Sequence, residues 1–583
     1  MFVFRTVVAA HLLYLCQASC YFSAELQGEY VMQTVTAGAH VQYSQVNITA
    51  EAIPMWGQCH QRQGDNVILF DSFNGTACMR CFHLKLHSAN VLQVHTCPTC
   101  LDQCYLTEEA ARHTCPTGDY FQRNYFKEIT LFRTKELGGG NIRKIFCPIT
   151  GQYTFMYDLY NQTDNRVECS PALSHLENCA DRAGGPQLDV HFQGCSHQYN
   201  DVTFDCLGDW AGTDGQRFLA LYDTSVLAGT DYRPQYRCAL YKQDEQNGNV
   251  IIAFSSDSTC TTDLYNASYG HMTWNLTVVP SSPWPAQVTN SKCSFPYWSQ
   301  GKWERFNINH NTLTYKDHTS FNTYTMRCVE AVDEGKLIVF SRNGCGEETY
   351  KCIQLKQRSR NVVEFQLGLT TSSFVNHSLC SDSNFLGNVW ITQARLEGLQ
   401  VSPCPVTGEY SGVIPDPNNV GLCARLASDQ THQEIMYFTV FDCDQQEVYE
   451  EREYQCLGQW EEDGVTYTYT QRKDFGTYEC FVGSIVSNND IYIKEAGEHC
   501  GRGINPKHMG MKLQTKGKQE LNIRPPETTQ PVTSWYVTSR PSSPTRPWKP
   551  ITGAPPRHSA SSKTSNSVGL FFLVTVTAVL LGC

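Results

Sequence analysis

The chain has 583 residues and a formal net charge of −12, and its 45 lysines and arginines are scattered along its length. No basic patch is present, which excludes nucleic acid as an expected partner. The 28 cysteines are typical of a disulfide-bonded protein from an oxidising compartment, so we expect an extracellular protein.

Residues 1–19 have the pattern of a secretory signal peptide. One positive charge at Arg5 is followed by an apolar run, and the small residues Ala18 and Ser19 come just before Cys20. We expect cleavage after Ser19, which would send the chain into the secretory pathway and remove Cys16.

Between residues 20 and 515, the sequence predicts two copies of a pair of modules. Cys147-Pro-Ile-Thr-Gly-Gln-Tyr153 recurs as Cys404-Pro-Val-Thr-Gly-Glu-Tyr410, and Cys206-Leu-Gly-Asp-Trp210 recurs as Cys456-Leu-Gly-Gln-Trp460. Residues 81–91 and 352–362 also share cysteine, leucine, lysine, serine, asparagine and valine at the same offsets. We therefore expect the order A–B–A′–B′. The modules span residues 20–125 (A), 147–280 (B), 293–395 (A′) and 404–515 (B′).

Each module is predicted to be a small antiparallel β domain. Short alternating runs recur between Gly, Asn and Asp residues, at 66–71, 217–222, 249–254, 336–341 and 467–471. Long segments of helical period are missing, and only residues 106–111 resemble a short helix. The predicted fold class is mostly β: four disulfide-stapled antiparallel modules and a disordered stalk.

Aromatic residues recur at fixed places in the modules. Near its start, each module has Gly, one spacer and an aromatic residue: Tyr30, Tyr153, Trp303 and Tyr410. This opening is similar to that of lipocalin-like barrels, in which the ring plugs one end of the barrel, but a plain core anchor in the first strand is the simpler interpretation. We interpret Trp210 and Trp460 as core anchors packed on a disulfide rather than as ligand anchors, because binding loops usually diverge between repeats.

The cysteines are predicted to be paired. Without Cys16 and Cys583, 26 remain, with 8 in A, 7 in B, 5 in A′ and 6 in B′. The odd counts in B and A′ predict a bridge between these two modules or cysteines that pair elsewhere, and Cys179 lacks a counterpart in B′. The half-cystines that repeat between B and B′ are Cys147, Cys169, Cys195, Cys206, Cys238, Cys260, Cys404, Cys423, Cys443, Cys456, Cys480 and Cys500.

Cys78-x2-Cys81-x15-Cys97-x2-Cys100 has the spacing of a four-thiolate zinc site. We favour a disulfide knot, because the secretory route oxidises neighbouring thiols and because A′ lacks both Cys-x2-Cys pairs. The acidic clusters at 450–453 and 461–463 lack the register of a calcium loop and are predicted to be solvated edges or loop tips. No metal or cofactor is expected.

Catalytic motifs are missing from the sequence. Neither the nucleophile elbow Gly-x-Ser-x-Gly nor His-Glu-x-x-His occurs, and we expect a protein that is not an enzyme.

The chain also carries signals for modification. Asn-x-Ser/Thr sequons predict N-glycosylation at Asn47, Asn74, Asn161, Asn266, Asn275 and Asn376. Residues 516–562, rich in Pro, Ser and Thr, are predicted to form an extended stalk. Residues 563–583 have the polar spacer and apolar tail of a GPI-attachment signal, with Ser559 and Ser561 as candidate attachment sites. A short transmembrane helix is the alternative.

These motifs resemble those of invertebrate, notably arthropod, cysteine-rich cell-surface proteins built from adjoining domains of unknown function. The resemblance rests on Cys147-Pro-x-x-Gly-x-Tyr153, Cys206-Leu-Gly-x-Trp210 and the Gln-Gly-aromatic openings at Gln27 and Gln300, and it implies no catalytic activity. We expect a GPI-anchored glycoprotein of the outer leaflet that acts in recognition, adhesion or as a co-receptor, with a shed extracellular form as the alternative. Its partner would be an extracellular protein or glycan, with a transmembrane co-receptor if it signals. The alternatives are a structural component of an apical extracellular matrix and a carrier of small apolar ligands in lipocalin-like barrels.

Overall fold

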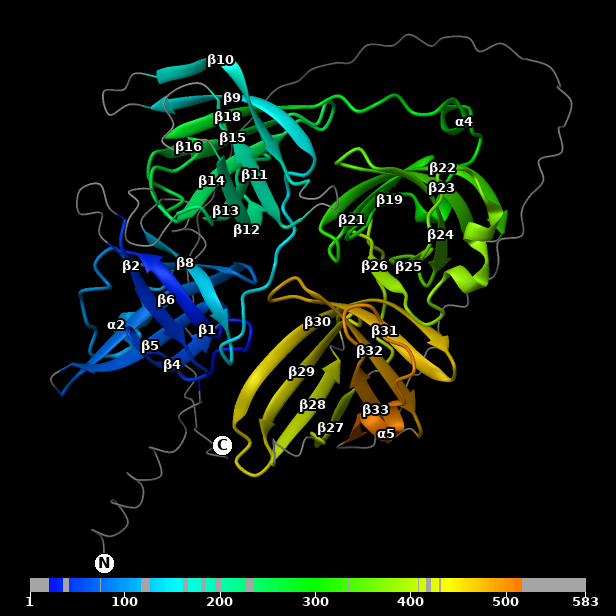
Figure 1. Cartoon of the computed structure of the whole chain (residues 1–583). Coiled ribbons are helices and arrows are strands. Elements are labelled where there is room, and N and C mark those ends of the chain that lie inside the picture. Colours follow the sequence, from blue (N-terminus) through cyan, green and yellow to red (C-terminus); the bar gives the residue numbers. More distant parts are fainter. Residues whose placement is uncertain are drawn as a thin grey trace, which may run out of the picture. The chain divides into compact units, whose positions relative to one another are not determined.

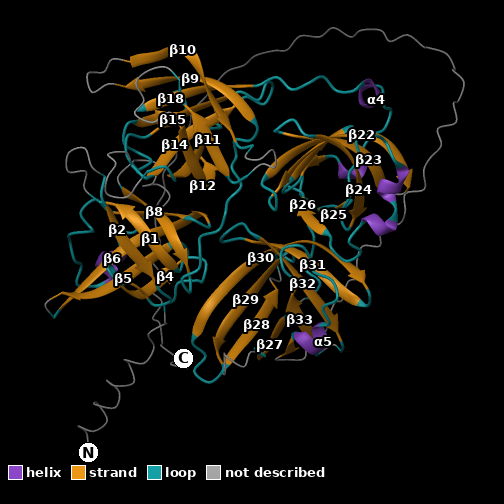
Figure 2. Ribbon diagram, in the orientation of Figure 1, coloured by secondary structure: helices purple, strands orange, loops and turns teal. Residues whose placement is uncertain are grey.

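The computed structural model describes residues 20–34, 41–73, 75–116, 126–160, 166–179, 185–193, 201–226, 234–333, 335–406, 408–415, 421–428, 431–487 and 489–515. Nearly all regular structure in these segments is strand, which confirms the mostly β fold class (Figures 1 and 2). The expected signal peptide, stalk and GPI signal, and the sequons at Asn74 and Asn161, lie outside the described residues. Within the described part of the chain, no helix has both the length and the apolar character needed to cross a membrane.

Module A is one eight-stranded sheet in the order β2-β1-β8-β7-β6-β5-β4-β3. All of its strand pairs are antiparallel. The short helix α2 overlaps residues 106–111, where a short helix was predicted. The elements are β1 (Gly28–Gln33), β2 (Tyr43–Ile48), β3 (Ala52–Ile53), β4 (Gly57–Gln63), β5 (Asn66–Phe73), β6 (Thr76–Ser88), β7 (Val91–Thr96), α2 (Glu108–Arg112) and β8 (Lys127–Glu136).

Module B is a closed barrel of eight strands in the order β10-β11-β12-β13-β14-β15-β18-β9. A small ribbon of β16 and β17 is inserted before the last strand. The strands are β9 (Gln152–Tyr160), β10 (Arg166–Glu177), β11 (Gln187–His191), β12 (Asp201–Ala211), β13 (Arg217–Asp223), β14 (Tyr236–Gln243), β15 (Val250–Phe254), β16 (Leu264–Asn266), β17 (Tyr269–Gly270) and β18 (Met272–Val278).

Module A′ is an eight-stranded meander from β19 to β26, preceded by short helices. Backbone bonds from Glu304 N to Ala394 O (2.9 Å) and from Leu396 N to Lys302 O (2.9 Å) bring its first and last strands together. The elements are α4 (Ala286–Thr289), η2 (Tyr297–Ser299), β19 (Gly301–Lys302), β20 (Phe306–Asn309), β21 (Thr312–Asp317), β22 (Asn322–Asp333), β23 (Lys336–Asn343), β24 (Glu348–Gln357), β25 (Val362–Leu367), η3 (His377–Cys380), η4 (Asp382–Asn384) and β26 (Ile391–Ala394).

Module B′ is a second closed barrel, in which the strands follow one another from β27 to β34. The elements are β27 (Glu409–Val413), β28 (Leu422–Ser428), β29 (Ile435–Asp442), β30 (Val448–Glu462), β31 (Val465–Arg472), β32 (Tyr478–Ile485), β33 (Asp490–Glu495), α5 (Pro506–Met509) and β34 (Met511–Thr515). The strands predicted from alternating runs in all four modules coincide with β5, β13, β15, β23 and β31.

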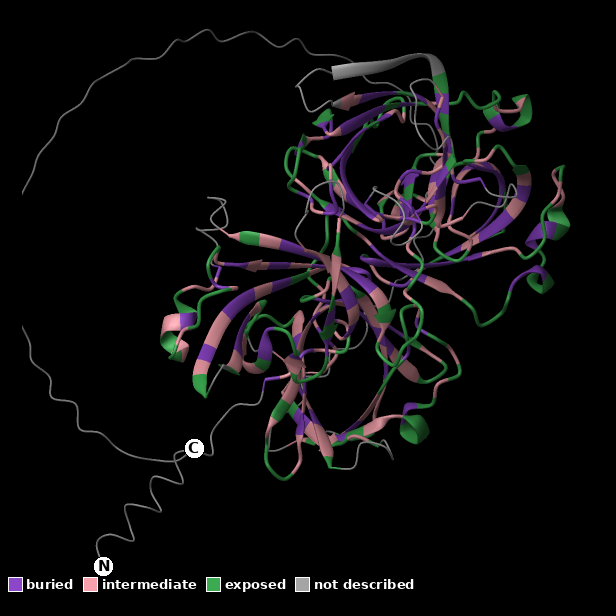
Figure 3. Ribbon diagram, turned by 60° about the vertical axis from the view of Figure 1, so that its left-hand side comes forward, coloured by how far each residue is buried: buried purple, intermediate pink, exposed green. Residues whose placement is uncertain are grey.

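Each module has its own core of buried residues, and Figure 3 shows buried positions along the strands. The interior of barrel B is filled by aromatic rings. Trp274, only 1% exposed, packs with its ring centroid 4.4 Å from that of Phe254 and 5.1 Å from that of Phe155. The four aromatic residues of the Gly-x-aromatic openings are all buried: Tyr30, Tyr153, Trp303 and Tyr410.

The disulfides repeat between equivalent modules. The matched bridges are Cys20–Cys59 with Cys293–Cys328, Cys81–Cys115 with Cys352–Cys380, Cys147–Cys206 with Cys404–Cys456, and Cys238–Cys260 with Cys480–Cys500. Cys423–Cys443 completes B′, whereas the side chains of Cys169 and Cys195 are not described. The predicted bridge between B and A′ is confirmed as Cys179–Cys345.

Candidate functional site

The repeated motifs of modules A and B lie against each other. In the first pair, Ser88 Oγ at the end of β6 donates a hydrogen bond to Leu207 O on β12 (2.7 Å). Asn90 is fully buried, and its Nδ2 donates to Arg143 O in the segment that leads to module B (2.7 Å). The Ser-x-Asn-Val segment of A and the Cys-Leu-Gly-x-Trp segment of B therefore form one interface.

The second pair repeats this interface. Asn361 Nδ2 donates to Leu457 O (2.9 Å) and to Gln400 O (2.7 Å), and its side chain is buried. Leu457 is the equivalent of Leu207, and Gln400 is the equivalent of Arg143 in the segment that connects A to B. The duplication has thus preserved a docking surface between modules as well as the disulfides within them.

The glycine of the Cys-Leu-Gly-x-Trp motif is explained by this interface. A Cβ atom on Gly208 would lie 2.3 Å from Ser88 Oγ, and one on Gly458 would lie 2.2 Å from Ser359 Oγ. Real Cβ contacts are not this short, so any larger residue would push the two modules apart. Gly458 is therefore required by close packing against A′.

The two tryptophans of the motif are buried and also face the neighbouring A-type module. Trp210 stacks on His87 of module A, with ring centroids 4.5 Å apart. Trp460 has the Arg358 guanidinium of A′ over its ring at 5.3 Å and stacks on Tyr467 of its own module. Both indoles thus contribute to the contact between modules.

The interface of the first pair is largely uncharged. His87 Nε2 lies 2.8 Å from Gln93 Oε1, and the ring packs on Trp210. Burial lowers the pKa of His87 below its ordinary value, which keeps the imidazole neutral near pH 7.

In the second pair, charged residues take these positions. Arg358 and Glu364 stand where His87 and Gln93 stand in the first pair. Arg358 binds both Glu364 and Glu462 of B′, the latter at 2.9 Å. Arg502 Nη2 lies 2.7 Å from carboxylate oxygens of the same two glutamates.

These four side chains form an ion network between A′ and B′, in which Arg358, Arg502 and Glu364 are buried and Glu462 is partly exposed. Glu364 is fully buried, and the carboxylate of Glu462 is held by the two arginines, which lower its pKa against the effect of burial. The prediction of solvated edges is wrong for Glu462, and also for Glu450, which binds Arg452 and Arg472. The sequence did not reveal the network, since Arg358 and Glu462 are 104 residues apart.

A second buried group lies close to this network. Tyr469 OH of B′ donates to Glu304 Oε2 of A′ (3.1 Å). Burial raises the pKa of Glu304 to about 7; Arg305 opposes this rise and Glu498 adds to it. The A′–B′ interface therefore contains a carboxyl group that changes charge near neutral pH.

A polar pocket of about 140 Å³ opens beside the docked motifs of A′ and B′. Arg360 and Gln459 contribute to its lining, and they replace Ala89 and Asp209 of the first pair. Arg360 Nη1 donates to Gln400 Oε1 (2.6 Å), which places the guanidinium in the pocket wall. The other polar lining residues are Ser359, Asn361, Gln400 and Ser402, and the rest of the lining is Val401, Pro403, Cys404 and Leu457.

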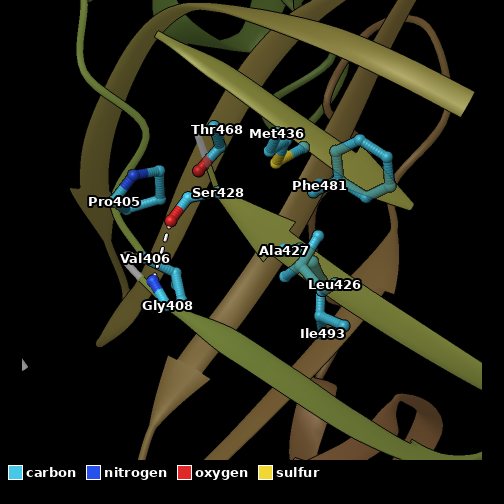
Figure 4. Close-up of a pocket in the computed structure, with 10 residues that line it drawn as sticks. All are labelled: Pro405, Val406, Gly408, Leu426, Ala427, Ser428, Met436, Thr468, Phe481 and Ile493. Atoms are coloured by element: carbon cyan, nitrogen blue, oxygen red, sulfur yellow. Dashed lines mark hydrogen bonds between the residues drawn. The ribbon is translucent and has the colours of Figure 1, made fainter. Parts of the chain in front are cut away.

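A smaller pocket lies within barrel B′. In Figure 4, Met436, Phe481 and Ile493 lie on one side and Pro405 and Val406 on the other. Its volume of about 30 Å³ has room for about two water molecules. The lining is mostly apolar.

Polar groups occur in the same small pocket. Ser428 and Thr468 contribute hydroxyl groups to the lining. Ser428 Oγ accepts a hydrogen bond from Gly408 N (2.7 Å), shown in Figure 4.

The zinc-like cysteines of module A form disulfides, as predicted: Cys78–Cys104, Cys81–Cys115 and Cys97–Cys100. Across the described segments, no group of three or more His, Cys, Asp or Glu side chains is placed to bind a metal ion. Four predicted glycosylation sites are described: Asn47 on β2, Asn266 at the end of β16, Asn275 on β18 and Asn376, which caps η3.

Four domain families match adjoining parts of the chain, and each is described only as a domain of unknown function. They are DUF7044 at residues 18–120, DUF7042 at 143–277, DUF7043 at 289–392 and DUF7045 at 404–506. Each match falls on one module. No curated protein matches the chain.

Among solved structures, the chain is similar to the vaccine antigen transferrin-binding protein B from Haemophilus parasuis Hp5, in a mutant form. The identity is 8%, and the match covers 83% of this chain and 94% of that one with a TM-score of 0.14. A TM-score this low supports no inference about function. The chain is thus a disulfide-bonded, multi-domain β protein built from four adjoining domains of unknown function.

Proposed function

We propose that the protein is a non-catalytic recognition protein of the cell surface, and that the A′–B′ pocket is its contact site. The polar pocket of about 140 Å³ is the observation that carries this proposal. Guanidinium, amide and hydroxyl groups in its lining are the types that bind the polar groups of a glycan or a peptide.

The difference between the two module pairs supports this choice. Both pairs keep the docking motif, yet Arg360 and Gln459 occur only in the second. A surface that duplication preserved and then altered at its solvent-facing positions is suited to a new ligand. The many disulfides support an extracellular setting for that ligand.

Membrane attachment is a separate part of the proposal. It rests on the GPI-like pattern of residues 563–583 and on the motif resemblance to invertebrate surface proteins. Phosphatidylinositol-specific phospholipase C should release the protein from intact cells. Retention after treatment would contradict a GPI anchor and favour a membrane-spanning tail.

Proximity labelling on living cells tests the recognition site. The full-length protein and an Arg360→Ala/Gln459→Ala variant are compared, with Arg143→Ala in the A–B connection as the matched control. We expect the double variant to lose at least one labelled surface partner that the wild type and the control both label. Identical sets of labelled partners for the wild type and the double variant would contradict the pocket as the contact site. Labelling of matrix proteins alone would favour a role in an extracellular matrix.

A further inference from the structure

Module B exposes apolar side chains beside its sequons. Asn275 lies in β18, with Ile251 of β15 directly opposite on one side and Met156 of β9 directly opposite on the other. Figure 1 shows these three strands side by side. Ile251 is 40% exposed and Met156 is 41% exposed, and Asn275 itself is exposed.

The sequon is presented on the outer wall of the barrel. Asn275 and Thr277 both point outward along β18, whereas Trp274 and Leu276 are buried in the core. Directly opposite residues in an antiparallel pair have their Cβ atoms about 4.5–5.5 Å apart. A sugar attached to Asn275 therefore starts between two apolar side chains.

The same juxtaposition occurs at the sequon of the inserted ribbon. Tyr265 and Tyr269 flank Asn266, are 67% and 42% exposed, and have ring centroids 5.0 Å apart. Single exposed apolar residues are ordinary, but here they are concentrated. In the described part of module B, four of the six strongly exposed large apolar residues flank a sequon: Met156, Ile251, Tyr265 and Tyr269.

We propose that Asn275 carries an N-linked oligosaccharide whose first sugars cover Met156 and Ile251, so that the glycan completes the surface of barrel B. This inference rests on the proposed extracellular location. The C–H face of a pyranose ring is apolar, and contact with the two side chains removes their surface from water.

The attachment is an ordinary group transfer. Asn275 Nδ2 forms a bond to the anomeric carbon of an oligosaccharide carried on a polyprenyl diphosphate. The bond from that carbon to the diphosphate oxygen breaks, the lipid diphosphate leaves with the electron pair, and the nitrogen loses one proton to a base of the transferase. Thr277 supplies the hydroxyl position that the sequon requires.

Four variants of the secreted protein test the inference. Thr277→Ala removes the sequon and leaves Asn275 in place, whereas Thr277→Ser keeps the sequon. Asn47→Gln removes a sequon on an exposed position of β2, where the residue opposite is the charged Glu29. Met156→Thr/Ile251→Thr removes the two apolar side chains from the barrel wall. This double variant is made both with Thr277, which keeps the glycan, and with Thr277→Ala, which removes it.

We expect mass spectrometry to find a glycan on Asn275. Thr277→Ala should lower the thermal midpoint by about 2–4 °C and increase the binding of an apolar dye. Thr277→Ser and Asn47→Gln should change neither property. In the Met156→Thr/Ile251→Thr background, loss of the glycan should have less than half this effect.

Two results would overturn the inference alone: a bare Asn275 beside occupied Asn47 and Asn376, or an effect of Thr277→Ala no larger than that of Asn47→Gln. Bare asparagines at all four described sequons, in a chain that is retained in the cytosol and not secreted, would overturn it together with the proposed extracellular location.

Discussion

At the scale of single residues, the most demanding position is the glycine of the Cys-Leu-Gly-x-Trp motif. Gly458→Ala would place a methyl group against Ser359 and Val362 of A′. We expect a loss of about 1–3 kcal/mol in the free energy of unfolding, because the modules must separate to admit it. Chemical denaturation measures this loss. Gly483→Ala on β32, where a Cβ atom makes only ordinary contacts, is the matched control and should be nearly neutral.

Glu304 predicts a pH dependence. Its pKa of about 7 in the folded protein is above the value of about 4.5 for an exposed glutamate, since burial disfavours the carboxylate. The folded state therefore binds more protons between these values, and the free energy of unfolding falls as the pH rises from 5 to 8, by up to about 3 kcal/mol. Glu304→Gln should flatten this part of the profile. A wild-type profile that rises over this range would contradict the assignment.

The sequence predicted the residues whose pattern lies within one segment, and it missed the residues whose role depends on a distant module. The half-cystines and the strand at 336–341 were predicted, because spacing and alternation are visible in a single segment. The partners of Trp210 and Trp460 were missed, because His87 and Arg358 belong to other modules. One signal was present: Ser-x-Asn-Val and Cys-Leu-Gly-x-Trp are both kept in the two copies, as expected for surfaces that contact each other.

At the scale of elements, the interface between β6 and β12 should respond to acid. His87 packs on Trp210 and bonds Gln93, and the titratable groups around it are Lys85, Glu128 and His95. Its folded-state pKa is lowered, mainly by burial, so the unfolded state binds more protons as the pH falls below about 6.5.

This stabilisation of the A–B interface is therefore lost on acidification, the opposite of the response at Glu304. Hydrogen exchange of β6 and β12 amides at pH 7 and pH 5.5 measures the loss. His87→Gln should remove the difference between the two pH values, whereas His432→Gln, an exposed histidine in B′, should retain it. An unchanged difference in His87→Gln would assign the acid response to another group.

The sequence predicted four β modules, but it did not predict which of them close into barrels. Closure depends on pairing between the first and last strands, such as β27 with β34, which are far apart in the chain. Alternation shows which residues of a strand face inward, not which strand lies beside it.

At the scale of the whole molecule, Cys179–Cys345 joins the two module pairs. Thr150 and Thr323 contact across the same junction, with their hydroxyl oxygens 3.1 Å apart. Proteolysis within the connection at residues 279–290 should leave the two halves together on a non-reducing gel and separate them on a reducing gel. Cys179→Ser/Cys345→Ser should let them separate without reductant. Separation of the cleaved wild type without reductant would contradict the bridge.

The central claim is that the duplicated motifs dock an A-type module onto a B-type module. A double-mutant cycle between Arg358 of A′ and Glu462 of B′ in the full-length protein tests it most directly. These side chains meet only if the two modules dock as described, with nitrogen and oxygen 2.9 Å apart. We predict a coupling free energy of about 1–3 kcal/mol, because removal of either partner leaves the other charge partly buried and less well paired. A coupling indistinguishable from zero, with both single variants folded, would contradict the docking.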